Sequence, residues 1–228
     1  MTKLRVGLIT TVDTNIGDDF IRQGICLLLG KAFKSVALDY VIVNKHEPIS
    51  VYPRWHPIHL AVNDSGSRKS SSYFSRVWAG LALQLTRNRF DGCDLIVQCG
   101  APVAWPDCHK CEWAGPLWYR VVIRLSSRIP VLNLAAGSCY PWERQPTQIA
   151  IPQDDQFLRA ILGCCHITTV RDRLAETLFG SLGFQTPLIP CLDECSAREP
   201  HCILGISVEQ VEEVLTELLS GEQFVSRC

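Results

Sequence analysis

Short apolar runs rich in β-branched residues alternate with segments of helical periodicity along residues 3–190. The first run, residues 3–12, is followed by apolar positions spaced as on one face of a helix, which include Phe20, Ile25 and Leu29. A polar turn containing glycine separates the two segments. This pattern predicts a strand that passes directly into a helix.

The same step repeats several times along the chain. The pattern predicts further strands at 35–44, 93–100, 130–137 and 166–172, and further helices at 73–90, 115–128, 154–164 and 173–183. Parallel neighbouring strands need long crossover connections, which are usually helices. We therefore expect an α/β fold with an open, mostly parallel sheet and helices on both faces.

Ligands of open α/β sheets bind beyond the carboxyl ends of the strands. The segments to search for a site are those that follow the predicted strands, namely residues 13–19, 44–72, 100–113, 136–153 and 171–173.

Composition narrows the possible functions. Among 228 residues, 22 are Lys or Arg and 23 are Asp or Glu, so no general excess of positive charge is available to bind a nucleic acid through its phosphates. No stretch approaches the roughly 20 apolar residues that a membrane-spanning helix needs. We expect a protein that does not span a membrane, and a cytoplasmic location in which the 12 cysteines are mainly reduced.

The first polar turn is a candidate binding site. Asn15 and Gly17 precede a helix whose first free amides favour an anion, and Gly17 permits a close backbone approach. Asp18 and Asp19 can instead cap those amides or accept hydrogen bonds from sugar hydroxyls. On residue type alone, a capped turn and a ligand loop are equally consistent with this stretch.

A second candidate lies where the strand at 166–172 passes into a helix. Arg171 would point from the strand end into the cleft, where its planar guanidinium can bind a carboxylate or a phosphate. Asp172 can cap the following helix. The alternative interpretation is that both residues only fasten the strand to the helix.

Cys108 and Cys111 form a C-x-x-C pair between Trp105 and Trp113. A structural zinc normally needs four ligands, and no second pair with regular spacing is obvious among the other cysteines, which include Cys139, Cys164, Cys165, Cys191, Cys195 and Cys202. Zinc binding, redox chemistry and an unliganded loop all stay open here. The tryptophans can stack on a sugar ring or pack beneath the loop.

His56 and His59 lie in a proline-rich stretch. Either can act as a general base near neutral pH, but no serine or cysteine signature pairs with them.

Three of these motifs occur together in one order. "TNIGDDFIRQGI", "DLIVQCGAPV" and "ITTVRDRLAETLFGSLG" make residues 4–190 resemble the polysaccharide pyruvyl transferase family. The resemblance implies one lobe of a glycosyltransferase-B-like architecture with Rossmann-like lobes. It also implies transfer of a pyruvyl group from phosphoenolpyruvate to a sugar acceptor as a ketal, in polysaccharide biosynthesis, with no cofactor.

The resemblance assigns substrate-binding positions by motif and leaves the catalytic residues unknown. Asn15, Gly17 and Asp18 would line the cleft on the acceptor side, Gly100 belongs to the glycine-containing loop, and Arg171 and Asp172 would lie near the lobe junction.

The chain divides into a predicted domain at 1–190 and an extension at 191–228 that contains cysteines and one amphipathic helix. That extension is too short to form the second lobe of the family. Alternative interpretations are therefore a non-catalytic binding or assembly module that works with another copy or a partner chain, and a zinc module built on Cys108 and Cys111.

Overall fold

A computed structural model shows residues 3–12, 16–56, 58–59, 87–141 and 143–189, and every structural statement below concerns this part of the chain. The six strands are β1 (Lys3–Thr10), β2 (Ala37–Asn44), β3 (Leu95–Cys99), β4 (Pro102–Ala104), β5 (Val131–Ser138) and β6 (Ile167–Val170). The α-helices are α1 (Ile16–Ala32), α4 (Ile123–Leu125), α5 (Pro152–Cys164) and α6 (Arg173–Ser181).

Three further helical segments complete the described fold. Two are short 3-10 turns, η1 (Pro48–Val51) and η3 (Cys108–Lys110). The third, η4 (Ala114–Val122), is a π-helix that continues into α4, and its wide first turn is closed by the Trp118 amide, which donates to the Trp113 carbonyl at 3.1 Å. Helix 115–128 was thus predicted correctly, but not its π character.

All strand pairs in the sheet are parallel, as the sequence predicted. The order is β2-β1-β3-β5, and β6 lies on the far side of β5. Strand β4 continues the line of β3, because β3 pairs with the first half of β5 and β4 with its last residues. The short β4 is the strand that the sequence pattern did not predict.

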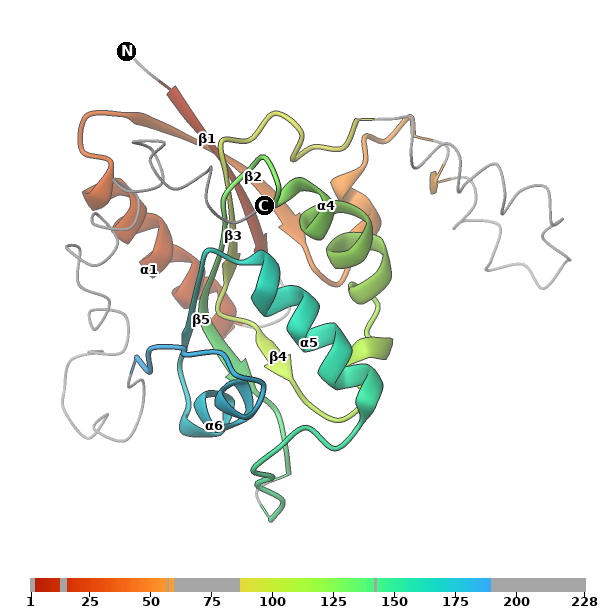
Figure 1. The fold of residues 1–228 in the computed structure, drawn as a ribbon. Coiled ribbons are helices and arrows are strands. Elements are labelled where there is room, and N and C mark those ends of the chain that lie inside the picture. Colours follow the sequence, from red (N-terminus) through yellow and green to blue (C-terminus); the bar gives the residue numbers. More distant parts are fainter. Residues whose placement is uncertain (1–2, 13–15, 57, 60–86, 142, 190–228) are drawn as a thin grey trace, which may run out of the picture.

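Helices cover both faces of the sheet (Figure 1). Val6 and Leu8 of β1 pack with Ile25 and Leu29 of α1 on one face, as the period of two along a strand requires. The opposite face is buried beneath η4, α4, α5 and α6, around Trp118 and other large side chains that include Phe157, Phe179, Leu117 and Leu158. The expected α/β architecture, with an open parallel sheet between helices, is confirmed.

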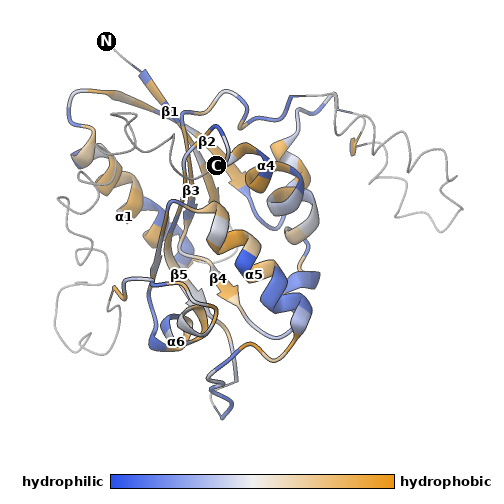
Figure 2. Ribbon diagram, in the orientation of Figure 1, coloured by the Kyte–Doolittle hydropathy of each residue, from blue (hydrophilic) through white to orange (hydrophobic). Residues whose placement is uncertain are grey.

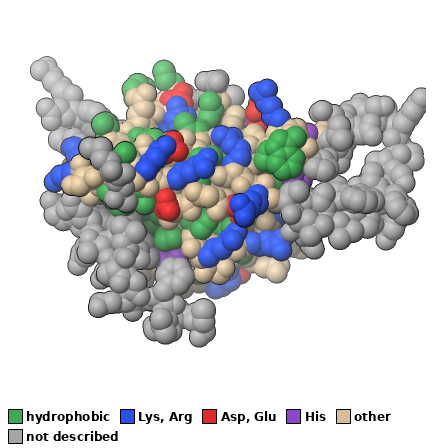
Figure 3. All heavy atoms as spheres, turned by 90° about the horizontal axis from the view of Figure 1, so that it is seen from above, with side chains coloured by type: hydrophobic (Ala, Val, Ile, Leu, Met, Phe, Trp, Pro, Cys, Tyr) green, Lys and Arg blue, Asp and Glu red, His purple; other side chains and the backbone are tan. Residues whose placement is uncertain are grey.

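The interior and one end of the protein differ in the kind of side chain they carry. The strands are coloured mainly as apolar (Figure 2). Seen from the end at which β1 begins, Lys and Arg side chains outnumber those of Asp and Glu (Figure 3). No helix among the described residues is both long and apolar enough to cross a lipid bilayer. The proposed boundary at residue 190 lies where the described part of the chain ends.

Candidate functional site

The strand order defines where a ligand site is expected. The chain moves from β1 to β2 on one side and then crosses to β3 on the other side of β1, so the direction of winding reverses between β1 and β3. Such a switch point leaves a crevice at the carboxyl ends of the two strands. Here these ends are Thr10 and Thr11 after β1 and Gly100 after β3.

Lys45, the first residue after β2, lies next to these strand ends. Its amide donates to the Thr10 carbonyl at 2.9 Å, which ties it to the end of β1. Its ammonium lies 4.0 Å from the Asp18 carboxylate of α1 and 5.0 Å from the ring centroid of Trp113. Since α1 and Trp113 belong to opposite helical layers, the lysine lies between the layers, directly above the edge of the sheet.

The Lys45 side chain is only 5% exposed, as is that of Asp18. Burial lowers the pKa of Lys45, and the Asp18 carboxylate only partly opposes this shift. The 4.0 Å separation is longer than a hydrogen bond. This pair is therefore an incompletely satisfied buried charge pair, which is the kind of feature that concentrates at functional sites.

The first turn of α1 is acidic. Asp18 is buried, whereas Asp19 forms an ion pair with Arg22 at 2.7 Å, and Arg22 also donates to the Thr11 carbonyl at 3.2 Å. The hydroxyl of Thr11 is buried and has no hydrogen-bond partner among the described residues. Gly17 is exposed at the same helix end, and Asn15 lies outside the described residues.

Arg171 and Gly100 are in contact at the edge of the sheet where β6 and β3 end. Gly100 adopts a positive φ of 58°, and Arg171 donates to its carbonyl from Nη1 at 2.7 Å. The Arg171 side chain crosses Gly137, where a Cβ atom would lie 2.5 Å from Nε. Gly137 thus leaves room for the arginine at the sheet edge.

Asp172 has the structural role that was the alternative interpretation. One carboxylate oxygen accepts from the Ala175 amide at 2.7 Å and caps α6, and the same carboxylate accepts from the amide and hydroxyl of Ser138. It fastens β5 to α6 and has few lone pairs left for a ligand.

Aromatic rings lie beside Lys45. The Trp105 and Trp113 rings lie 5.4 Å apart, and His46 meets Trp113 edge-on at 5.3 Å. The Nδ1 atom of His46 lies 2.7 Å from a carboxylate oxygen of Glu112. Trp113 is only partly buried, so it combines a fixed position with an accessible surface.

A second histidine–carboxylate pair supports the same loop. Asp154, which is 1% exposed, accepts from the amides of Asp107 and His109 at 2.8 and 3.0 Å and lies 2.5 Å from His109 Nδ1. Burial by itself would raise the pKa of Asp154, but the hydrogen bonds from His109 and Asp107 outweigh it and lower that pKa. Asp154 thus holds the 105–113 loop as a carboxylate.

The cysteine and histidine candidates are mostly structural. Cys108 is fully buried, and burial raises the pKa of Cys111 to about 11, so without a bound metal this thiol stays protonated at neutral pH. The described residues contain no group of three or more possible metal ligands, and cysteines 191, 195, 202 and 228 lie outside them. His56 is buried, and its Nδ1 accepts from the Ile58 amide at 3.0 Å.

Sequence reasoning missed Lys45 and Asp154. Lys45 falls in a long segment flagged as a possible ligand loop, and the available signal was its place as the first residue after a strand. Asp154 was visible only as an acidic residue near a helix start. Both act through contacts with residues far away in the sequence, which periodicity does not reveal.

Comparison with known proteins assigns no family. No protein-family model matches the chain, and no curated protein matches it. Among solved structures, the azoreductase AzrA has a TM-score of 0.44 at 10% identity, covering 93% of this chain and 99% of its own. An azoreductase from Bacillus anthracis str. Sterne has the same TM-score and identity, covering 95% of this chain and 100% of its own.

A third matching structure is an FMN-dependent NADH-azoreductase from Bacillus anthracis str. Ames Ancestor in complex with FMN. It has a TM-score of 0.40 at 10% identity, covering 96% of this chain and 99% of its own. Scores of this size do not transfer an activity to the chain. The class that the structure does define is the fold class, an α/β protein with an open parallel sheet.

The expectation of a polysaccharide pyruvyl transferase is wrong. No such family matches the chain, and the matching structures are azoreductases. The assignments that came with it, namely phosphoenolpyruvate as donor, a sugar acceptor and polysaccharide biosynthesis, are wrong as well. Neither alternative interpretation, a zinc module or a non-catalytic assembly module, is supported instead. The expectation of no cofactor came with the pyruvyl transferase assignment and falls with it; one matching structure is in complex with FMN.

The three motifs have a simpler physical origin. Asp18 lies in an acidic first helical turn, Gly100 supplies a left-handed residue after a strand, and Asp172 caps a helix. Any parallel α/β fold needs such residues where strands end and helices begin. The order of the three motifs along the chain therefore indicates the fold and not the reaction.

Proposed function

We propose that this chain binds a small ligand of the mononucleotide class, with a phosphate and a flat ring, in the crevice between the carboxyl ends of β1 and β3. The observation that carries this proposal is the buried Lys45 ammonium, 4.0 Å from Asp18 and 5.0 Å from the Trp113 ring centroid. A cation and an aromatic surface at one switch point are the two features that a phosphate and a ring require.

The strand order supports the same place. With β4 counted as a continuation of β3, the order is β2-β1-β3-β5-β6, which corresponds to 2-1-3-4-5. Flavodoxin-like sheets of this order bind FMN at the β1/β3 switch point. The strand order and the position of Lys45 therefore indicate the same place for a ligand.

The side chains suggest how such a ligand would be held. The acidic first turn of α1 disfavours a phosphate directly at that helix end, so Lys45 is the better anchor for it. Trp113 offers a face for the ring, and Asp18 can accept hydrogen bonds from ligand hydroxyls. Gly17, Gly100 and Arg171 border the crevice, and Asn15 is retained with them as a candidate from the sequence.

Calorimetric titration with FMN and with AMP tests the proposal. We expect one-site binding of at least one of them, and Lys45→Met should weaken it about tenfold or more, since a hydrogen bond to a charged group contributes about 1.5–3 kcal/mol. Trp113→Ala should also weaken binding and should reduce the quenching of FMN fluorescence. Lys31→Met, at the far end of α1, is the matched control and should bind normally. Absence of binding by both nucleotides would contradict the proposal.

A further inference from the structure

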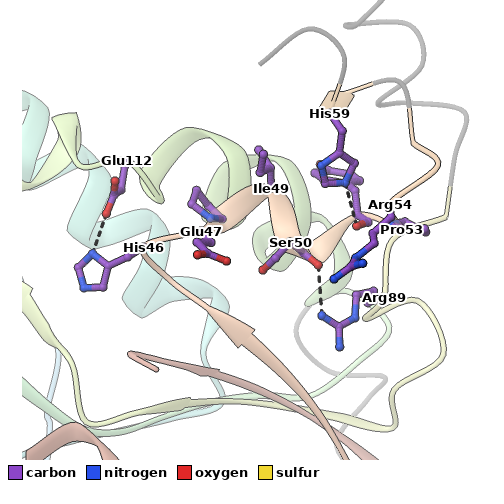
Figure 4. A pocket seen from close by; sticks show the side chains of 11 residues that line it. His46, Glu47, Ile49, Ser50, Pro53, Arg54, His59, Arg89 and Glu112 are labelled. Carbon is purple, nitrogen blue, oxygen red and sulfur yellow. Dashed lines mark hydrogen bonds and ion pairs between the residues drawn. The ribbon is translucent and has the colours of Figure 1, made fainter. Parts of the chain in front are cut away.

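A separate pocket of about 980 Å³ lies between the segment that follows β2 and the segment that precedes β3. Figure 4 shows His46 and Glu112 at one end and Arg54, Arg89 and His59 toward the other. This volume is within the range of small-molecule sites in proteins. The Lys45 ammonium, Asp18 and Trp113 do not line it.

The two ends of the pocket differ in charge. At one end, His46 and Glu112 contact each other, so the Glu112 carboxylate has the histidine as its hydrogen-bond partner. Toward the other end lie Arg54 and Arg89, and neither has a carboxylate partner among the described residues. Glu47 also lines the pocket and lies between His46 and Ser50 in Figure 4, so the two guanidinium groups lie toward one end and the two carboxylates, of Glu47 and Glu112, toward the other.

The pocket wall is held in place by hydrogen bonds that leave donors free. The Arg89 amide donates to the Val51 carbonyl at 2.8 Å, and its Nη1 donates to the Ser50 carbonyl at 3.2 Å. An arginine side chain has five N–H donors, so the others can bind a ligand. The Nε2 of His59 lies 3.2 Å from the Tyr52 carbonyl and therefore donates to it.

The surroundings add positive charge. Arg120 and Arg124, on the helix formed by η4 and α4, lie near enough to act on the charge of Tyr52, a pocket residue, although burial still raises the pKa of that tyrosine. Asp91 acts on the same tyrosine with the opposite sign. The positive charge is therefore local to the end of the pocket at Arg54 and Arg89, where an anion would bind.

We propose that this pocket is a second ligand site, which binds a small molecule through a phosphate or carboxylate group held by Arg54 and Arg89. The planar fork of arginine suits both groups, because it can donate two parallel hydrogen bonds to their oxygens. This site does not depend on the mononucleotide site at Lys45.

Calorimetric titration with inorganic phosphate and, separately, with citrate tests this proposal at constant ionic strength. We expect saturable one-site binding of at least one anion, weakened tenfold or more in the double variant Arg54→Gln, Arg89→Gln. The two titrations distinguish a phosphate site from a carboxylate site. The conservative variant Arg54→Lys, Arg89→Lys, which keeps the charge but loses the fork, should bind with intermediate affinity.

Two controls separate the possible outcomes. Lys31→Gln, Lys34→Gln removes the same charge near the end of α1 and should bind the anions as the wild-type chain does. Lys45→Met should lose nucleotide binding and keep anion binding, so failure of one site does not imply failure of the other. Binding of neither anion would overturn the proposal, and so would equal weakening in the Arg54/Arg89 and Lys31/Lys34 variants.

Discussion

At the scale of single residues, the pair formed by Asp18 and Lys45 distinguishes the crevice from an ordinary protein interior. Both side chains are 5% exposed, and their charged atoms are 4.0 Å apart. Removing two charges from water usually costs more than such a contact returns. The proposed mononucleotide site gives this pair a role other than stability.

This pair allows a test that separates stability from binding. The double variant Asp18→Asn, Lys45→Met should be at least as stable as the wild-type chain, whereas Lys45→Met alone should lose about 3 kcal/mol, because it leaves a buried carboxylate unpaired. Urea unfolding at pH 7 measures both. A double variant that is less stable than Lys45→Met would show that the pair serves to stabilise the fold.

Unlike the pair of Asp18 and Lys45, Asp154 stabilises the fold, because its carboxylate has hydrogen-bond partners in Asp107 and His109. Asp154→Asn should lower the free energy of unfolding at pH 7 by about 1–3 kcal/mol, since a buried donor loses its charged acceptor. The pKa of Asp154 is lowered in the folded state, so its contribution is complete above the unfolded pKa near 3.8 and disappears as the pH falls through the lower folded value. The difference between wild type and variant should therefore shrink below about pH 4 in unfolding measurements. A difference that stayed constant with pH would contradict this account.

At the scale of elements, the junction of β3 with α1 depends on one glycine. Gly100 has a φ of 58°, and a Cβ atom there would lie 2.2 Å from Cγ2 of Ile21 on α1. Both the backbone conformation and the close approach of the helix therefore require glycine. Because Arg171 donates to the Gly100 carbonyl, this junction also positions the arginine.

Gly100→Ala should destabilise the protein by more than about 2 kcal/mol, from left-handed strain of roughly 1–2 kcal/mol and the added steric conflict with Ile21. Gly30→Ala is the matched control, since it lies in α1 with no atom within 4 Å of the added methyl group. It should stabilise the helix by up to about 1 kcal/mol. Thermal unfolding of the two variants checks these opposite signs, and similar stabilities would contradict the described junction.

The elements themselves were predictable to the extent that they are governed by local periodicity. Strand 35–44 and helix 173–183 are found within a few residues of the predicted bounds, as β2 and α6. Strand β4 was missed because its three residues are too few to show a period. Of the helix predicted at 73–90, residues 73–86 lie outside the described residues and stay a prediction, whereas residues 87–90 are not helical.

At the scale of the whole molecule, the sequence predicted the layers of the fold, whereas the ligand-binding role of its candidate residues stays a prediction. Alternating strands and helices imply a parallel sheet with its loops at one edge, and Gly100 and Arg171 do meet there. The contact between Lys45 and Trp113 joins two segments that are far apart in the sequence, and only the packing of both helical layers on the sheet creates it. Motif order indicated a family wrongly, because helix caps and left-handed glycines recur in all such folds.

The proposed mononucleotide site lies between the carboxyl ends of β1 and β3, next to Lys45 and Trp113. The most direct test is an NMR titration of the ¹⁵N-labelled chain with FMN and, in parallel, with AMP. The account predicts saturable shifts of the Trp113 indole N–H and of the Lys45 amide with at least one of them, while the Lys31 amide stays unchanged. Saturable shifts confined to other residues, or no shifts with either nucleotide, would contradict it.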